Sequence, residues 1–138
     1  MRLRVLLSGL TFFVAAIALA ALPLLAQAHP VDTSKSCTIR GTNDADFLLG
    51  TSRADVICGY GGGDTISGGG GADVMKGGGG PDRIQGDGGG DAMLGGDGND
   101  VLYSYDGTHD HVSGGRGSDR LPRHDVSLDR TRSIESFS

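Results

Sequence analysis

Apolar residues between Gly41 and Leu121 recur every nine positions, a spacing that fits neither a helix nor a simple alternating strand. Written in register, this stretch forms nine rows, and the eighth position of each row is apolar. These positions are Leu48, Ile57, Ile66, Met75, Ile84, Met93, Leu102, Val112 and Leu121. We predict a short strand around each, with the eighth side chain pointing inward and positions seven and nine pointing out into water. A fixed period this short indicates a solenoid.

The polar positions follow the same period. The sixth position of every row is aspartate: Asp46, Asp55, Asp64, Asp73, Asp82, Asp91, Asp100, Asp110 and Asp119, with Asp110 displaced by one inserted residue. Glycine fills the first position of all rows but one, and from Gly59 onward it often fills the second and fourth. Such glycines allow successive carbonyl oxygens to turn toward one point, as a hard, oxygen-seeking cation requires. A repeated Asx-turn is the alternative, which explains one aspartate well and nine poorly.

The rows resemble the hemolysin-type calcium-binding repeat, or RTX nonapeptide, whose consensus is G-G-x-G-x-D-x-U-x. The resemblance implies an all-β fold, a right-handed parallel β-roll solenoid of nine nonapeptide repeats with short N- and C-terminal caps. It implies Ca²⁺ as the cofactor, bound between the turns of rows i and i+2. The implied ligands are carboxylates of the nine sixth-position aspartates and the turn backbone. The backbone positions are Gly59, Gly62, Gly68, Gly71, Gly77, Gly80, Gly86, Gly89, Gly95 and Gly98.

The rows differ in how well they match. The first two have Asp44 and Arg53 where later rows have glycine, so we expect weaker metal sites there. The insertion near His109 affects the pairing of Asp91 with Asp110 and of Asp100 with Asp119. We therefore expect about four to six bound ions.

The predicted core is thin, because each row contributes one apolar side chain. Ordering a glycine-rich chain costs much conformational entropy. We therefore expect a largely unfolded metal-free chain that folds when calcium binds.

Residues 1–28 have the pattern of a signal peptide: a basic start, an apolar run from Val5 to Leu25, and an A-x-A site that predicts cleavage after Ala28. An uncleaved membrane anchor is the alternative, since the apolar run is nearly long enough to span a bilayer. We expect a secreted, extracellular protein with no stable membrane insertion after cleavage. The predicted divisions are 29–40 as an N-terminal leader, 41–121 as the roll and 122–138 as a C-terminal cap.

Cys37 and Cys58 are the only cysteines. An even number in an oxidising compartment predicts one disulfide, which would fold the leader back over the first coil. A metal-bound pair or a reactive thiol is the alternative, without a CxxC motif to support it.

Charge narrows the possible partners. Without Arg2 and Arg4 the chain has ten basic and seventeen acidic residues, a net charge of −7, which disfavours nucleic acid and anionic lipid. The C-terminal end is locally basic, with Arg116, Arg120, Arg123, Arg130 and Arg132. This end is interpreted as a cap, with Val126 and Leu128 in a last strand and Ile134 and Phe137 over the core, or else as a docking site for an acidic surface.

Two further clusters leave alternatives open. Asp97 and Asp106 lie in the third position of their rows. They are interpreted either as additional calcium ligands or as residues that only form turns. His109 and His111 could hold zinc, or belong to a solvated insertion.

No catalytic motif is present, and the rows and caps leave no room for a catalytic domain, so we do not expect an enzyme. The predicted function is that of a secreted calcium-ion-binding protein. The alternative is a calcium-stiffened adhesin or matrix module that recognises a cell-surface glycan or protein. Position seven carries no regular ladder of one residue type, but Phe47, Tyr60, Tyr103 and Tyr105 could form a small patch.

Overall fold

The computed structural model of the protein describes residues 35–124, 130–132, 134 and 136–137. The predicted signal peptide and the strand expected at Val126 and Leu128 lie outside these residues. Within the described ranges every regular element is a β-strand, and no helix there could cross a membrane.

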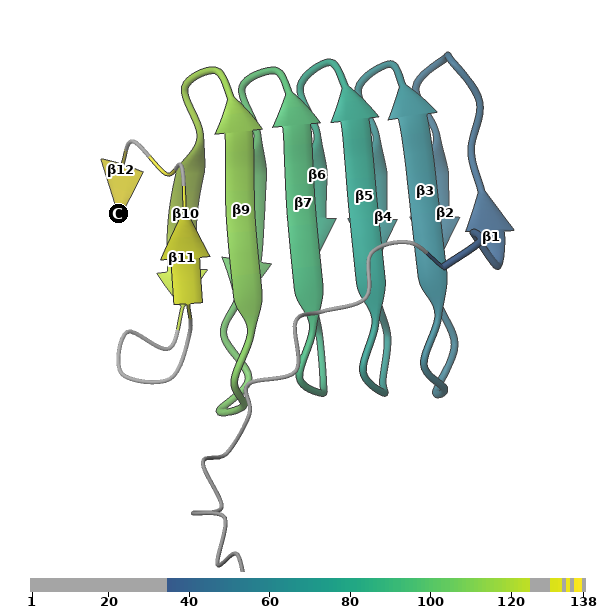
Figure 1. Ribbon diagram of the computed structural model, residues 1–138, viewed down its shortest axis with the longest axis vertical. Coiled ribbons are helices and arrows are strands. Elements are labelled where there is room, and N and C mark those ends of the chain that lie inside the picture. The colour runs from purple at the N-terminus through teal and green to yellow at the C-terminus, as the bar shows by residue number, and fades with distance from the viewer. Residues whose placement is uncertain (1–34, 125–129, 133, 135, 138) are drawn as a thin grey trace, which may run out of the picture.

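In the part of the chain that the structure describes, twelve strands stack into two parallel six-stranded sheets (Figure 1). Sheet A contains β1 (Ile39–Arg40), β3 (Val56–Gly61), β5 (Val74–Gly79), β7 (Ala92–Asp97), β9 (His111–Arg116) and β11 (Arg130–Arg132). Sheet B contains β2 (Phe47–Leu49), β4 (Thr65–Ser67), β6 (Arg83–Gln85), β8 (Val101–Ser104), β10 (Arg120–His124) and β12 (Ser136–Phe137). The chain alternates between the sheets, so two rows complete one coil.

The strand register places equal positions of the rows side by side. Ile66 pairs with Ile84 in sheet B, and Met75 pairs with Met93 in sheet A. This pairing, parallel throughout, confirms the predicted parallel β-solenoid, with about five turns. The number of nine repeats and the domain limits stay predictions from the sequence.

The core consists of the eighth-position side chains, which stack between the sheets. All nine are buried, and most are inaccessible to solvent. Ile39 and Ile134 pack against the two ends of this stack, so the expectation that Ile134 shields the core is confirmed. The side chain of Phe137 lies outside the described residues.

The prediction that positions seven and nine all face water was wrong for four residues of sheet A. Val56, Val74 and Ala92 in position seven are 6%, 9% and 1% exposed, and Cys58 in position nine is 4% exposed. They form a second apolar cluster on the outer face, against which Cys37 packs. Parallel in-register pairing places these small side chains against one another, so they shield each other. Sheet B follows the prediction, since Phe47 and Leu49 are exposed on its outer face.

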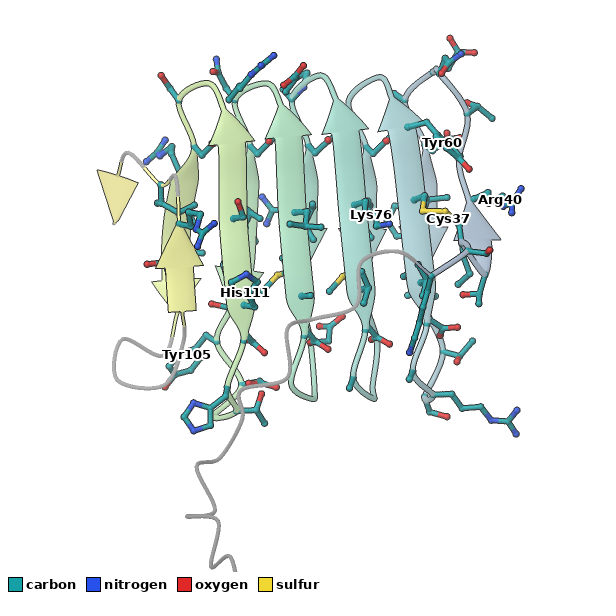
Figure 2. All side chains as sticks on the ribbon, viewed as in Figure 1. Cys37, Arg40, Tyr60, Lys76, Tyr105 and His111 are labelled. Carbon is teal, nitrogen blue, oxygen red and sulfur yellow. A yellow bond between two sulfur atoms is a disulfide. The ribbon has the colours of Figure 1, made fainter. Side chains whose placement is uncertain are left out.

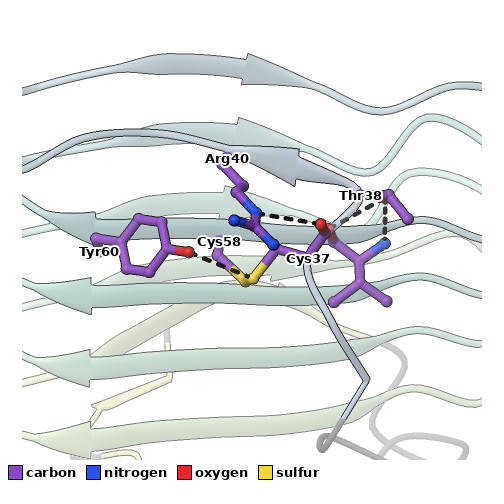
Figure 3. Close-up of a disulfide and its surroundings, with 6 residues drawn as sticks. Cys37, Thr38, Arg40, Cys58 and Tyr60 are labelled. Carbon is purple, nitrogen blue, oxygen red and sulfur yellow. Dashed lines mark hydrogen bonds between the residues drawn. A yellow bond between two sulfur atoms is a disulfide. The ribbon is translucent and has the colours of Figure 1, made fainter.

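The predicted disulfide joins Cys37 to Cys58, across 21 positions of the sequence (Figure 3). It ties the segment before β1 to β3. Close by, the Thr38 hydroxyl accepts a 2.9 Å hydrogen bond from the backbone N–H of Val56, and Arg40 Nε donates to the Cys37 carbonyl. The disulfide therefore reinforces a join that the backbone of β1 also makes with β3.

Candidate metal centre

The sixth-position aspartates form two ladders, one along each edge where the chain passes between the sheets. The A-to-B edge, where the chain passes from sheet A to sheet B, carries Asp46, Asp64, Asp82, Asp100 and Asp119. The B-to-A edge, on the opposite side, carries Asp55, Asp73, Asp91 and Asp110. From Asp64 onward every member is at most 3% exposed. Aspartates of rows i and i+2 are thus neighbours along one edge.

From Asp64 onward, one carboxylate oxygen of each aspartate accepts a hydrogen bond from the preceding coil. Oδ1 of Asp82 accepts a 2.8 Å hydrogen bond from the backbone N–H of Asp64, and Oδ1 of Asp91 accepts one of 2.9 Å from Asp73. The same bond occurs all along both ladders. Each bond joins two aspartates one coil apart and satisfies only Oδ1.

The second oxygen, Oδ2, is buried with no donor from the described residues. This holds for Asp64, Asp73, Asp82, Asp91 and Asp100. A buried carboxylate oxygen without a donor or a cation is energetically costly. The turns therefore present a row of oxygens that a ligand has to satisfy.

For Asp64, Asp73, Asp82 and Asp100, a backbone carbonyl oxygen faces the same small space as Oδ2 at the first-position glycine. A Cβ added to Gly77 would lie 2.1 Å from Asp82 Oδ2 and 2.6 Å from the carbonyl oxygen of Gly95 in the next coil. The same pair of oxygens meets at Gly59, Gly68 and Gly95. Two acceptors facing the same small space repel each other unless a cation or a proton lies between them. Glycine is required here because any side chain would fill that space.

The family comparison agrees with this geometry. The model of the RTX calcium-binding nonapeptide repeat (4 copies) matches residues 40–75, 67–102 and 85–121, more than half of the chain. The chain belongs to this family of RTX repeats. Its cofactor is Ca²⁺. Comparisons with curated proteins and with solved structures found no match.

The oxygens of the RTX turns suit calcium. Ca²⁺ takes six to eight oxygen ligands, from carboxylates and backbone carbonyls, in flexible geometry. The two edges of the roll supply both carboxylate oxygens and glycine carbonyl oxygens. Among the described residues, no three His, Cys, Asp or Glu side chains gather as a metal site. Any ion in these turns would therefore depend on backbone oxygens as well as on paired aspartates.

Burial makes the metal-free ladders poor at holding negative charge. Burial raises the pKa of Asp82 to about 6, and the pKa of Asp91 to about 7. The neighbouring aspartates raise both values further, while the backbone N–H donors oppose the change. Burial also raises the pKa of Asp73 and of Asp100. A divalent cation would offset the cost of burial and the repulsion between neighbours by neutralising the carboxylates.

The first two RTX rows differ from the others. Oδ2 of Asp46 accepts hydrogen bonds from the backbone N–H and the hydroxyl of Thr42. Thr51 makes the same two bonds to Oδ2 of Asp55, and its hydroxyl is the main cause of a lowered pKa at Asp55. These carboxylates are already satisfied within their own turns. That agrees with the weaker metal sites expected there.

The insertion leaves the ladders intact. Asp110 and Asp119 accept the backbone N–H bonds of Asp91 and Asp100, both at 2.9 Å. The added residue is absorbed in the turn, where Asp106 Oδ2 accepts a 2.9 Å bond from the Gly89 N–H. In the preceding coil a backbone carbonyl accepts the equivalent bond. Sequence alone left both aspartate pairs in doubt, and the structure places both in the ladder.

The remaining candidates lie outside the ladders. Asp97 is exposed, 4.0 Å from Arg116, and Asp106 binds the backbone N–H and the hydroxyl of Thr108. Both agree with the turn-forming role. His109 is exposed and His111 half-buried, and within the described residues they belong to no metal cluster.

Sequence reasoning did not single out Asp87, which occupies the second position of its row. This position has φ between 90° and 118° at Gly69, Gly78, Gly96 and Gly115. Asp87 adopts φ 63° there, which few non-glycine residues do. The signal available was a charged residue in a column that later rows fill mostly with glycine.

Proposed function

We propose that the chain is a secreted calcium-ion-binding protein whose glycine and aspartate turns take up about four to six Ca²⁺ and fold as they do so. The observation that carries the proposal is the repeated approach of a buried Asp Oδ2 and a glycine carbonyl oxygen at the first-position glycines. Ca²⁺ is the ion whose ligand preference and flexible geometry fit such a site.

Each ion would lie between two neighbouring members of a ladder. Seven such pairs exist, and in five of them both aspartates are buried. These five are Asp64 with Asp82, Asp82 with Asp100, Asp100 with Asp119, Asp73 with Asp91, and Asp91 with Asp110. The two pairs that include Asp46 or Asp55 compete with threonine donors. Five strong sites lie within the expected range.

Folding on binding follows from the same burial. Without metal, a folded chain has to bury carboxylates that repel one another and, in Asp64, Asp73, Asp82, Asp91 and Asp100, have an Oδ2 without a donor from the described residues. The thin core offers little apolar burial against that cost. An ion that binds only the folded form shifts the equilibrium toward it by mass action.

Secretion is supported by the signal-peptide pattern of residues 1–28 and by the disulfide, since such bonds persist in oxidising compartments. An N-terminal sequence of the exported chain that begins at His29 would establish cleavage.

The central experiment is calcium titration of the oxidised full chain, followed by circular dichroism and calorimetry in parallel. We expect a disordered spectrum in excess chelator, a β-rich one in millimolar calcium, and four to six ions per chain. Mg²⁺ at equal concentration is the control, since its strict octahedral demand suits these turns poorly. A chain that is equally β-rich in chelator would contradict coupled folding, and a chain that takes up no calcium would overturn the proposal.

A recognition role is the second candidate, favoured by aromatic side chains that the fold leaves exposed. Phe47 is 74% and Tyr105 69% exposed, and both lie on the sheet B side of the roll. A calcium-stiffened roll would hold such residues in place as an adhesin or matrix module does. A glycan array or cell-binding assay with and without calcium tests this role.

A further inference from the structure

The outer face of sheet B contains a pocket of about 340 Å³ that calcium binding does not use. It is lined by Arg83, Gln85, Asp87, Tyr103 and Tyr105. Arg83 and Gln85 belong to β6, and Tyr103 belongs to β8, the neighbouring strand, where it pairs with Gln85. Two paired strands therefore hold three of the five lining residues in position.

Aromatic surface forms one part of the pocket. The Arg83 guanidinium carbon lies 4.4 Å from the centre of the Tyr103 ring, so the cation stacks on its face. Tyr105 follows directly after β8 and is 69% exposed. Figure 2 shows Tyr105 near the turns at one edge and Tyr60 near those at the other.

Fixed polar groups form the other part. Asp87 Oδ2 accepts hydrogen bonds from the Ser67 hydroxyl and, at 3.3 Å, from the Gly69 N–H, and its Oδ1 accepts one from the Gln85 amide. Within the described part of the chain, no carboxylate or carbonyl oxygen accepts a hydrogen bond from Arg83. The guanidinium donors are therefore available to a ligand.

The backbone at Asp87 allows the contribution of its carboxylate to be tested. Asp87 lies in a position where neighbouring rows have glycine at positive φ, so glycine would suit its backbone better. A glycine at this position would therefore remove the carboxylate without straining the backbone.

We propose that this pocket binds a neutral saccharide. A sugar ring has an apolar C–H face, which aromatic rings cover, and an edge of hydroxyl groups, which need both donors and acceptors. Arg83 donates, Asp87 accepts and Gln85 does both. The charges of Arg83 and Asp87 balance, so the pocket favours neither an anion nor a cation. The site rests on the calcium-folded roll, because only that fold brings β6 and β8 together.

The test uses the oxidised full chain in millimolar calcium, with its circular dichroism recorded first. The probes are glucose, galactose and mannose, each as the methyl glycoside and as a linear tetrasaccharide, with methyl glucuronide as the acidic comparison. Tyrosine fluorescence is a suitable readout, because the chain has three tyrosines and no tryptophan. We expect at least one neutral probe to change the fluorescence saturably. Tighter binding of the tetrasaccharide indicates a polysaccharide chain as the ligand, and equal binding indicates a single ring.

Two variants locate the binding. Asp87→Gly removes the carboxylate and leaves the residue that the backbone conformation prefers, so the fold should survive. Tyr105→Ala removes the exposed ring. We expect each to weaken saccharide binding at least tenfold.

Tyr60→Gly is the matched control. Tyr60, with φ 80°, is the other non-glycine residue of the described chain at positive φ, in the same position of its row but on the other edge. We expect the saccharide affinity of this variant to stay within twofold of that of the unchanged chain. Without Tyr60, the fluorescence comes only from the two pocket tyrosines.

Binding that survives Asp87→Gly, equal loss in Tyr60→Gly, or binding of the glucuronide alone would overturn the proposal. A folded chain that binds no probe would overturn the saccharide site and leave calcium binding standing. A chain that stays unfolded in calcium would overturn both.

Discussion

The backbone N–H of Asp64 donates a 2.8 Å hydrogen bond to Oδ1 of Asp82, the residue one coil later in the roll. This bond engages one carboxylate oxygen in holding two coils together and leaves the buried Oδ2 for another partner. Asp82 is thus both a structural link between coils and a possible oxygen ligand for a metal at the turn.

Asp82→Asn tests the two uses separately. Asparagine keeps an oxygen that can accept the Asp64 N–H, but it lacks the negative charge that strengthens calcium binding. Asp82 belongs to two proposed pairs, so we expect the number of bound ions to fall by about two and the calcium midpoint for folding to rise at least tenfold. Calorimetry measures the first and circular dichroism the second.

Asp97→Asn is the control for that variant, since Asp97 is exposed and lies outside the ladders. It removes the same charge, and we expect it to change the calcium midpoint by less than twofold. Equal effects of the two substitutions would mean that overall charge, and not the ladder, attracts calcium.

Gly77→Ala tests the space at the first position of a row. The added Cβ would lie 2.1 Å from Asp82 Oδ2, so the turn has to shift, and we expect a loss of about 1–3 kcal/mol in the free energy of unfolding. Gly79→Ala is the control, because its Cβ would approach nothing closer than 3.9 Å. Urea unfolding in calcium compares the two. A tolerated Gly77→Ala would show that the oxygens do not converge there.

Lowering the pH should stabilise the metal-free fold and destabilise the calcium-bound fold. In chelator, the pKa values of about 6 for Asp82 and about 7 for Asp91 lie above the ordinary value because burial disfavours the charged forms. Protonation therefore stabilises the metal-free fold at low pH, and this stabilisation is lost as pH rises through 6 to 7. In calcium, protons compete with the ions, so the fold weakens as pH falls through the same range.

Circular dichroism at about pH 5.5 and pH 8 measures both responses. More β-structure at the lower pH in chelator, and a higher calcium midpoint there, are the expected results. The same direction of change in both conditions would contradict the assignment of buried, unsatisfied carboxylates.

Loss of the disulfide should lower stability without removing calcium sites. Cys37 and Cys58 close a loop of about twenty residues, so Cys37→Ala with Cys58→Ala should cost about 3 kcal/mol in the free energy of unfolding. The number of ions should stay the same, because neither cysteine lies in a ladder. Urea unfolding and calorimetry in calcium measure the two quantities. A lower ion count would show that the first coil also helps to form the sites.

The period of the sequence determined most of the fold. A nine-residue repeat with one apolar position per row predicts an inward column of residues such as Ile66 from spacing alone. The pairing of Asp64 with Asp82 followed from the resemblance to RTX repeats, and the structure bears it out. The disulfide followed from the number of cysteines and the compartment that the first 28 residues indicate. These features depend on local geometry and on a constant step between coils.

Only the tertiary structure decided what happens between side chains of different coils. The burial of Val74 on the outer face of sheet A, the stacking of Arg83 on Tyr103 and the retention of Asp110 in its ladder all depend on contacts across coils. The position of Asp82 Oδ2 and the Gly95 carbonyl oxygen around the same space beside Gly77 is also set by packing across coils. The sequence repeat fixes which residue occupies each position, but the packing of the coils sets the distance between atoms one coil apart.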